Sequence, residues 1–428
     1  MYLIDKYTKQ MKKQISFFSL LIVFVIYFPL CLAAEKVEAI SPETEAKIQS
    51  LVMKGNLPSL QVAVISENQI VWLKTFGQPA GINNLYKIGS IQKVLISTAV
   101  LLLHERGLVD INKDIGEYIP FLVRHPNYHC IPITIKMLLA HRSGLDIFRF
   151  QYEWDTRLLK YNKPETQNTN KILNLSRDEF LKESLDSTAA NYDTTVWKFK
   201  PGTGFHYSNS AYLILSYLIE KVSGESFAQF VDENILKQLE MDRTVFIYQD
   251  SAKRDVTAYT RKDDQNIELP FWEGMFTTAE DMSKFMIALL NNGKYKDKYL
   301  LKPETIDLMR EKHSQEQSLY NLSDDCPFPG YGLGIIYYGD NWYGHGGSTV
   351  GYQSLWSFNK SSKKGYVILT NINGLCHGRK NFDSVWATVS AVEKELKSEL
   401  RGIGYRNYYI AGVVVMIIIL VSIRILKK

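Results

Sequence analysis

Apolar and polar residues near the start of the folded region predict two helices with a hairpin between them. The segment 41–55 (SPETEAKIQSLVMKG) begins with serine and proline and carries acids in its first turn, as helix N-termini commonly do. Residues 60–65 (LQVAVI) and 70–77 (IVWLKTFG) are apolar runs joined by the turn SENQ, which is typical of a hairpin. A second, strongly apolar helix begins at Ser90 and is closed by Gly107.

The pattern changes twice more along the chain. From Gly107 to Asp281 it is mostly helical, strand-like runs return only from Tyr331, and a last helix is predicted over 383–400. The simplest fold is α+β, an α/β sandwich. One antiparallel sheet would be built from both ends of the domain 35–400, flanked by helices, with a mostly helical subdomain inserted. The late strand-like runs are YGLGIIYYG, NWYGHGG, GYQSLWSFN and GYVILTNI.

The first 34 residues have the layout of a secretory signal peptide. Lysines between Lys6 and Lys13 precede an apolar stretch, 15–34, that ends in small residues. That stretch is also long enough for an uncleaved N-terminal anchor. Residues 1–34 are therefore predicted to be a signal peptide or an anchor, and either one implies export.

The C-terminus predicts a single transmembrane helix over residues 408–426. Side chains from Tyr408 to Ile423 are uncharged, and with its flanks the stretch approaches the ~20 residues that span a bilayer. Tyrosines would lie at one interface and Arg424 with the terminal lysines at the other. A buried core helix does not explain that basic cluster, and a GPI signal would end in apolar residues. Residues 401–407 would be a linker, and the domain would face the extracytoplasmic (periplasmic or extracellular) side of the cell membrane.

Composition and charge exclude other classes of function. The 428-residue chain is 46% hydrophobic with a formal net charge of +5, and it has no basic stripe interleaved with aromatics, so nucleic acid is not an expected partner. No C-x-x-C pair suggests a metal or redox site, and no cofactor is expected. Loss of Cys31 with a signal peptide would leave Cys130, Cys326 and Cys376, enough for one disulfide and one thiol, with the pairing open.

Ser90 and Lys93 form an S-x-x-K pair at the start of the apolar helix, directly after a glycine. The spacing places both on one helix face, and a helix N-terminus favours negative charge on the serine oxygen. Serine is a weak nucleophile until a base takes its proton, and a desolvated lysine can be neutral enough to do so. The alternative is a capped helix with a lysine that extends to solvent. Two further S-x-x-K matches, in the polar turn 357–364, show that the spacing alone is weak.

Two later segments carry residues that fit the same chemistry. Tyr207 and Asn209 precede another apolar helix, and His345, Gly346 and Gly347 lie on a predicted strand. Each has a structural alternative: a core aromatic, an N-cap or a bulge. Together, the order Ser-x-x-Lys, Tyr-x-Asn, His-x-Gly resembles the serine β-lactamase and penicillin-binding protein superfamily. The resemblance is to its class C β-lactamase-related branch of S12 peptidases and D-aminopeptidases.

The resemblance covers residues 41–400, since ITIKMLLAHRSGL, FKPGTGFHYSN, GMFTTAEDMSKF and YGLGIIYYG are similar to family landmarks. It implies that Ser90 attacks a carbonyl to form an acyl-enzyme, while Lys93 and Tyr207 share the role of base as a coupled pair. Tyr207 would then protonate the leaving group and help to activate the deacylating water. Asn209 would bind Lys93 and the substrate amide.

The resemblance also implies how a substrate is held. The backbone N–H groups of Ser90 and Ser348 would form the oxyanion hole, whose donors are typically worth about 3 kcal/mol each. His345, Gly346 and Gly347 would bind the substrate along their strand. The two glycines would let a substrate backbone lie against that strand as an extra edge.

One departure from the family bears on the substrate. Where β-lactamases and many penicillin-binding proteins have lysine followed by Thr-Gly, this chain has His345 and Gly346. Histidine is only partly charged near neutral pH, and glycine offers no hydroxyl for a substrate carboxylate. Arg142 is a candidate replacement cation, although a structural ion pair is the commoner role for an arginine in such a loop. His141 and His206 are expected to be structural.

Three functions fit these residues. The first is an exported, membrane-tethered serine hydrolase that cleaves a peptide or amide, such as a D-residue or peptidoglycan-type peptide, or a β-lactam. The second is an esterase or acyl transferase with the same Ser-Lys-Tyr site. The third is a non-catalytic penicillin or wall-ligand receptor, which would need no nucleophile. The expected partners are a small molecule or short peptide and the membrane, and the oligomeric state is left open.

Overall fold

The computed structural model describes most of the chain between Ile40 and Arg401. The predicted signal peptide or anchor and the predicted transmembrane helix lie outside the described residues, as do Cys326 and Cys376. Within the described part, no helix is long and apolar enough to cross a membrane, and Cys130 is an exposed free thiol. The described residues are 40–77, 81–145, 177–189, 192, 194–247, 257–262, 265–268, 274–318, 327–374, 380–381 and 383–401.

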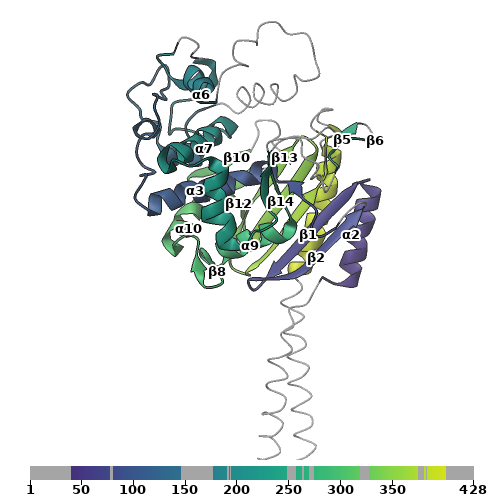
Figure 1. Ribbon diagram of the computed structural model, residues 1–428. Helices are drawn as coiled ribbons and strands as arrows, with labels where there is room; N and C mark the ends of the chain where they lie inside the picture. The colour runs from purple at the N-terminus through teal and green to yellow at the C-terminus, as the bar shows by residue number, and fades with distance from the viewer. Residues whose placement is uncertain are drawn as a thin grey trace, which may run out of the picture. The chain divides into compact units, whose positions relative to one another are not determined.

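An eight-stranded antiparallel sheet organises the compact unit 52–389 (Figure 1). Its strand order is β10-β11-β12-β13-β14-β15-β1-β2. Leu60 of β1 lies opposite Thr370 of β15, so early and late strands pair, and the predicted sheet from both ends of the domain is confirmed. The strands are β1 (Ser59–Ser66), β2 (Gln69–Gly77), β10 (Ser314–Ser318), β11 (Pro327–Tyr331), β12 (Ile336–Gly339), β13 (Trp342–Thr349), β14 (Tyr352–Asn359) and β15 (Lys364–Thr370).

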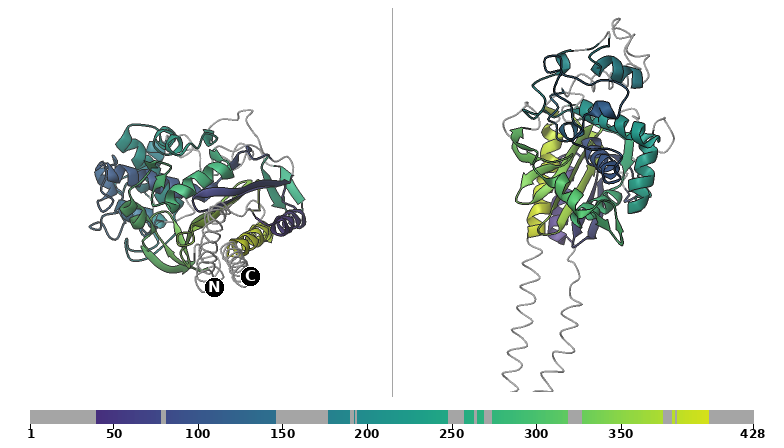
Figure 2. Two further views of the ribbon diagram at one scale, coloured as in Figure 1. Left: turned by 90° about the horizontal axis from the view of Figure 1, so that it is seen from below. Right: turned by 90° about the vertical axis from the view of Figure 1, so that its left-hand side faces the viewer.

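Helices are inserted between β2 and β10, as the sequence predicts, and the left view of Figure 2 places the blue and teal helical segment at one side of the sheet. Three of the helices, α3, α7 and α9, are strongly apolar, in keeping with their burial on several faces. The helices are α2 (Pro42–Lys54), η1 (Gly89–Ile91), α3 (Gln92–Glu105), η2 (Ile115–Glu117), α4 (Ile135–Leu139), α6 (Arg177–Leu185), η5 (Thr194–Val196), α7 (Asn209–Ser223), α8 (Phe227–Val231), η6 (Asp232–Leu236), η7 (Lys237–Leu239), α9 (Ala279–Leu290) and α10 (Pro303–Arg310), and a last helical stretch spans 383–401.

Several short strands were not predicted, and four of them, β4 to β7, lie inside the stretch 107–281 that is predicted to be mostly helical. The short strands form three small sheets, β3-β7-β4, β16-β5-β6 and β8-β9. The β3-β7 and β16-β5 pairings join distant parts of the chain, whereas β8-β9 is a local hairpin. Strands of two to four residues are too short to show a period in the sequence. They are β3 (Tyr86–Lys87), β4 (Val245–Ile247), β5 (Tyr259–Lys262), β6 (Gln265–Glu268), β7 (Gly274–Thr277), β8 (Lys294–Tyr295), β9 (Lys298–Tyr299) and β16 (Ile372–Asn373).

The predicted strand YGLGIIYYG is in fact divided. β11 ends at Tyr331 and β12 begins at Ile336, and the two pair as an antiparallel hairpin. Gly334 between them has φ +80 and passes so close to α3 that a Cβ there would lie 2.0 Å from Ser97 Oγ. Only glycine fits that approach, and the apolar pattern runs on through the turn without a break.

α9 covers one face of the main sheet through a tryptophan on β14. Trp356 Nε1 donates to the carbonyl of Met282 at 3.0 Å, and its ring stacks on Phe285 with centroids 5.7 Å apart. All three residues are buried. Burial of side chains this large contributes strongly to stability and fixes the helix over the strands.

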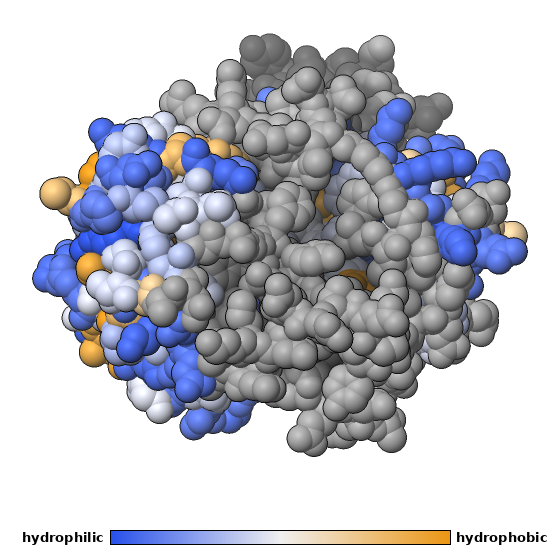
Figure 3. Space-filling model, turned by 90° about the horizontal axis from the view of Figure 1, so that it is seen from above, coloured by the Kyte–Doolittle hydropathy of each residue, from blue (hydrophilic) through white to orange (hydrophobic). Residues whose placement is uncertain are grey.

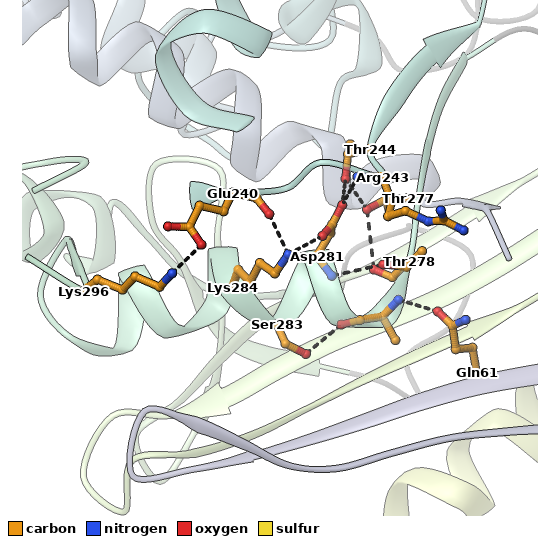
Figure 4. Close-up of polar contacts among 11 residues, drawn as sticks. Gln61, Glu240, Arg243, Thr244, Thr277, Thr278, Asp281, Ser283, Lys284 and Lys296 are labelled. Carbon is orange, nitrogen blue, oxygen red and sulfur yellow. Dashed lines mark hydrogen bonds and ion pairs between the residues drawn. The ribbon is translucent and has the colours of Figure 1, made fainter. Parts of the chain in front are cut away.

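The N-terminus of α9 is held by a group of polar contacts (Figure 4). Thr278 caps the helix, accepting from the N–H of Asp281 at 3.1 Å. The buried Asp281 carboxylate accepts from Thr244 Oγ1 at 2.9 Å and from Lys284 Nζ at 2.9 Å. Thr244 also bonds Thr277 on β7 at 2.7 Å. The network therefore fixes β7, which pairs with the strand that leads to Ser90.

The second compact unit combines residues up to 51 with residues from 390 onward. Its described parts are helical and are joined by a buried carboxylate. The backbone N–H of Ser41 donates to Glu399 at 3.2 Å, and Thr44 Oγ1 donates to the same carboxylate at 2.8 Å. Two hydrogen bonds to a charged group hold the two helical segments together.

On the face shown in Figure 3, the described hydrophobic residues lie scattered among hydrophilic ones. Such scattering is normal for the solvated surface of a protein.

Candidate active site

Ser90 lies in a tight turn between a short strand and a buried helix. β3 pairs with β7, with Tyr86 opposite Thr277. Gly89 then turns the chain with φ +52, Ser90 lies in η1, and α3 begins at Gln92. The helix was predicted to begin at Ser90, and the difference arises because a 3₁₀ turn precedes the α-helix. The serine is thus not a helix cap, and its oxygen accepts a hydrogen bond from Lys93 instead.

Lys93 is buried and points at Ser90. Its side chain is 6% exposed, and Nζ lies 3.0 Å from Ser90 Oγ. A lysine that extends to solvent, the alternative from the sequence, is therefore wrong. Burial lowers the pKa of Lys93 from 10.5 to about 7, because the charged form loses its hydration. Near neutral pH this amine can take the proton from the serine.

Tyr207 faces the same lysine from a different element. It lies just before α7 and is 4% exposed, and Lys93 Nζ lies 4.8 Å from the centroid of its ring. Ser208, not Asn209, caps α7, accepting from the N–H of Ala211 at 3.2 Å. Asn209 is the first residue of the helix, and its bond to Lys93 stays a prediction.

β13 runs directly past the nucleophile turn. A Cβ on Gly347 would lie 1.9 Å from the carbonyl oxygen of Ile88, and a Cβ on Gly89 would lie 2.9 Å from the backbone nitrogen of Ser348. Ser354 on β14 donates to that same Ile88 carbonyl at 2.8 Å. The two glycines let the strand and the turn approach closely. The Ser348 N–H is thus beside the nucleophile turn, where an oxyanion donor is needed, although the oxyanion role of Ser90 and Ser348 stays a prediction.

The other substrate-binding candidates on β13 face different surroundings. β12 pairs with β13 only as far as Gly344, so the strand edge from His345 onward is not covered by β12. A Cβ on Gly346 would lie 3.3 Å from the ring of Trp386, away from the turn that Gly347 meets. Substrate binding by these residues stays a prediction, supported by an edge that an extended backbone could join.

The partial charge expected on His345 is not found. The ring is 2% exposed, and burial lowers its pKa to about 3, helped by the neighbouring Lys93. Its Nδ1 lies 2.6 Å from the carbonyl of Gly346, and its Nε2 lies 3.3 Å from the hydroxyl of Tyr331. The histidine is therefore neutral at physiological pH and does not act as a partial substitute for a lysine.

Arg142 serves the fold rather than the site. It donates to the backbone carbonyl of His313 at 2.7 Å and also to that of Gly202. The arginine thus joins two loops through carbonyl groups, where a structural ion pair was expected. His141 is fully buried, in line with a structural role.

Several residues around the site were not identified from the sequence. Tyr212 on α7 lies with its ring centroid 5.6 Å from Lys93 Nζ, and Tyr331 bonds both buried histidines. In the sequence both resemble ordinary core aromatics, because no local pattern distinguishes a tyrosine beside an active site from a tyrosine that only packs in the core. No group of three His, Cys, Asp or Glu side chains among the described residues could hold a metal ion.

Comparison with known proteins agrees with this geometry. Protein flp of Staphylococcus aureus (strain MRSA252) is 25% identical over 352 residues, covering 76% of this chain. The chain spans 62% of the length of that relative. The octameric penicillin-binding protein homologue from Pyrococcus abyssi has a TM-score of 0.65 at 22% identity, over 86% of this chain and 80% of that one.

A third similar structure is the D-amino acid amidase from Ochrobactrum anthropi, with a TM-score of 0.63 at 18% identity, over 83% of this chain and 99% of that one. At such identities the likeness is one of fold. The family profile described as Beta-lactamase matches residues 44–388, a span that contains Ser90, Lys93, Tyr207 and the β13 strand. The chain therefore belongs to the beta-lactamase family, within the serine β-lactamase and penicillin-binding protein superfamily.

Proposed function

We propose that this protein is an exported, membrane-tethered serine hydrolase that cleaves a peptide or amide through an acyl-enzyme at Ser90. The observation that carries the proposal is the buried Lys93, with Nζ at 3.0 Å from Ser90 Oγ and a pKa lowered to about 7. A receptor that only binds a ligand has no use for a desolvated amine beside a serine. Removing the Lys93 amine from water costs free energy, and a catalytic role for the amine accounts for that cost.

The proposed reaction begins when Lys93, coupled to Tyr207, accepts the proton of Ser90 as Oγ attacks the substrate carbonyl. The N–H groups of Ser90 and Ser348 would stabilise the oxyanion. Collapse of the tetrahedral intermediate breaks the scissile bond, and Tyr207 returns the proton to the leaving group. Water activated by the same pair would then hydrolyse the acyl-enzyme and regenerate Ser90.

A D-residue or peptidoglycan-type peptide is the proposed substrate, with β-lactams as a second possibility for the same site. The likeness of fold to a D-amino acid amidase supports an amide. An esterase or acyl transferase is the second candidate function. The neutral, buried His345 favours this second function, because a site without a positive charge at this position has no cation there to bind a carboxylate on the substrate.

The deciding experiment is intact-mass analysis of the full-length protein in detergent, treated with a fluorophosphonate probe or with a penicillin. We expect one adduct per chain with the probe and none with the Ser90→Ala variant, which serves as the matched control. A panel of D- and L-amino acid amides, D-residue peptides and esters then ranks the substrates. Labelling of Ser90→Ala as fast as the parent would rule out the acyl-enzyme proposal.

The rate of acylation should rise with pH along a limb centred near pH 7. Lys93 must be neutral to accept the proton, and its pKa in the folded protein is about 7. Below that pH the rate should fall about tenfold per unit, and above it the rate should level off. The measurement is the labelling rate between pH 5 and pH 9, and a flat profile would contradict Lys93 as the base.

The membrane tether can be tested by topology. Basic residues flank the apolar segments at both ends on the same side, so the domain is proposed to face outward. An alkaline phosphatase reporter fused after Leu400 should be active, and one fused after Lys428 should be silent. The reverse pattern would exclude this orientation.

A further inference from the structure

His141 is bonded to the backbone on both sides of Tyr207. Its carbonyl accepts from the N–H of His206 at 2.9 Å, and its ring Nδ1 accepts from the N–H of Ser208 at 3.0 Å. The histidine follows α4 in a left-handed conformation, with φ +56, and is fully buried. A non-glycine residue in this conformation is uncommon, and it persists only where its surroundings hold it.

The imidazole ring also supports the phenol itself. The ring centroids of His141 and Tyr207 lie 4.4 Å apart with the planes tilted by 41°. The Tyr207 ring is in turn 4.8 Å from Lys93 Nζ. The position of the tyrosine relative to the lysine therefore depends on where His141 holds it.

The hydrogen-bond partners fix where the protons lie. The N–H of Ser208 can only donate, so Nδ1 of His141 accepts and its Nε2 carries the hydrogen, which points to the Tyr331 hydroxyl at 3.1 Å. At the other end, the carbonyl of Gly346 can only accept, so Nδ1 of His345 carries a hydrogen. His345 Nε2 is then the acceptor for the Tyr331 hydroxyl at 3.3 Å.

These bonds make one directed chain from the N–H of Ser208 through His141, Tyr331 and His345 to the carbonyl of Gly346. It connects the loop that carries Tyr207 with the strand that carries the Ser348 N–H. We propose that His141 is a positioning residue, which through this chain sets Tyr207 at a fixed distance from the oxyanion strand. The proposal rests on the proposed function, because it assigns Tyr207 the acid–base role.

The surroundings keep both histidines neutral, as the chain requires. Burial lowers the pKa of His141 well below its usual value, and the positive charge of Lys93 lowers it further, as would any charge on the nearby His345 and His206. Protonation of His141 would remove the acceptor for the Ser208 N–H. The phenols of Tyr207, Tyr212 and Tyr331 are its other titratable neighbours.

Two substitutions separate the bond to Ser208 from the bond to Tyr331. His141→Asn keeps an acceptor near the position of Nδ1 and tolerates the positive φ, whereas His141→Gln places its amide near Nε2 and loses that acceptor. We expect His141→Gln to slow fluorophosphonate labelling of Ser90 at least about tenfold, and His141→Asn to stay within about threefold of the parent. For His141→Gln acting on the best ester from the substrate panel, kcat should fall while KM stays within about threefold of the parental value.

The matched control is His125→Gln. His125 is also buried, and its Nδ1 also accepts a backbone N–H, that of Asn127 at 3.0 Å, but its ring packs on Tyr128 and Trp197. This variant should lose stability without a change in labelling rate. Equal labelling by parent and His141→Gln would overturn the inference and leave the proposed function intact. A parent that the probe does not label would remove both.

If His141→Gln does not fold, Tyr331→Phe tests the proposed chain of hydrogen bonds instead. It removes only the Tyr331 hydroxyl, which joins the two histidines and also hydrogen-bonds Tyr212, and it should slow labelling at least about threefold. An unchanged labelling rate in Tyr331→Phe would overturn the proposed chain of hydrogen bonds.

Long-range ¹H–¹⁵N correlation spectra give a test without substitution: His141 should be the Nε2–H tautomer and His345 the Nδ1–H tautomer from pH 6 to pH 8. The opposite tautomer at either ring would also overturn the inference.

Discussion

Lys93→Met is expected to slow acylation of Ser90 by at least about 10²-fold while the protein stays folded. Methionine keeps most of the apolar stem and removes the amine that lies 3.0 Å from Ser90 Oγ. Without it the serine loses the amine proposed to take its proton, and Tyr207 would have to accept that proton instead. The rate to measure is formation of the acyl-enzyme with the best amide or ester from the panel.

The same substitution should make the protein more stable, and the gain should depend on pH. The pKa of Lys93 is 10.5 as an ordinary lysine and about 7 in the folded protein. Between these values the unfolded chain binds more protons, so the stability of the parent rises with pH across this window. Below pH 7 the full penalty applies, on the order of 5 kcal/mol. Urea unfolding should therefore show a larger advantage for Lys93→Met at pH 6 than at pH 9.

Lys284→Met is the matched control, because its effect on stability should be the opposite and acylation should not change. Lys284 is only 16% exposed, but it pairs with the buried Asp281 at 2.9 Å. Burial alone would lower the pKa of Lys284, yet the hydrogen bond and the charge of Asp281 raise it overall. Its removal should destabilise the protein, since a buried carboxylate loses its partner, and should leave acylation unchanged.

Two outcomes would contradict the assigned role of Lys93. One is acylation by Lys93→Met at the parental rate. The other is a double variant, Ser90→Ala with Lys93→Met, that is much less active than Ser90→Ala, because groups that act as a unit are not additive.

The sequence was sufficient to predict the main sheet and the segments that meet at the site. Strands such as β1 and β15 are long and apolar, and the helix after Ser90 is apolar almost throughout, so burial on several faces is visible in the pattern. The pairing of Ser90 with Lys93 follows from helical spacing, which does not depend on the rest of the fold. Elements and contacts of this local kind are what a sequence specifies best.

Contacts across the fold are less visible in the sequence. The charge of His345 was misjudged because its environment is built from other parts of the fold. The ring is buried and bonds Tyr331 on a different strand, and the charge of Lys93 on a helix distant in sequence lowers its pKa further. His141 could not be placed beside Tyr207 for the same reason. A signal was available in the loop AHRSG, where a histidine follows an apolar helix directly, but it does not say which backbone N–H groups the residue meets.

Gly347→Ala should slow acylation by about 10²–10³-fold, the scale for loss of an oxyanion donor. The added Cβ would lie 1.9 Å from the carbonyl oxygen of Ile88 and 2.3 Å from Ser354 Oγ, and the first of these is backbone that cannot swing away. Either β13 or the turn before Ser90 must shift. The Ser348 N–H would then move away from the position that the oxyanion occupies.

Gly346→Ala is the neighbouring control for this prediction. Its Cβ would lie 3.3 Å from the edge of the Trp386 ring, a contact that a shift of a few tenths of an ångström relieves, and 4.0 Å from the carbonyl oxygen of Ser354, which is an ordinary contact. Labelling of Ser90 should therefore stay within about threefold of the parent in Gly346→Ala and collapse in Gly347→Ala, with melting temperatures measured for both. If both glycine variants acylate Ser90 at the parental rate, the close approach of β13 to the Ile88 carbonyl does not set the position of the oxyanion donor. If Gly346→Ala is the slower variant, the substrate contacts the strand on the Trp386 side instead.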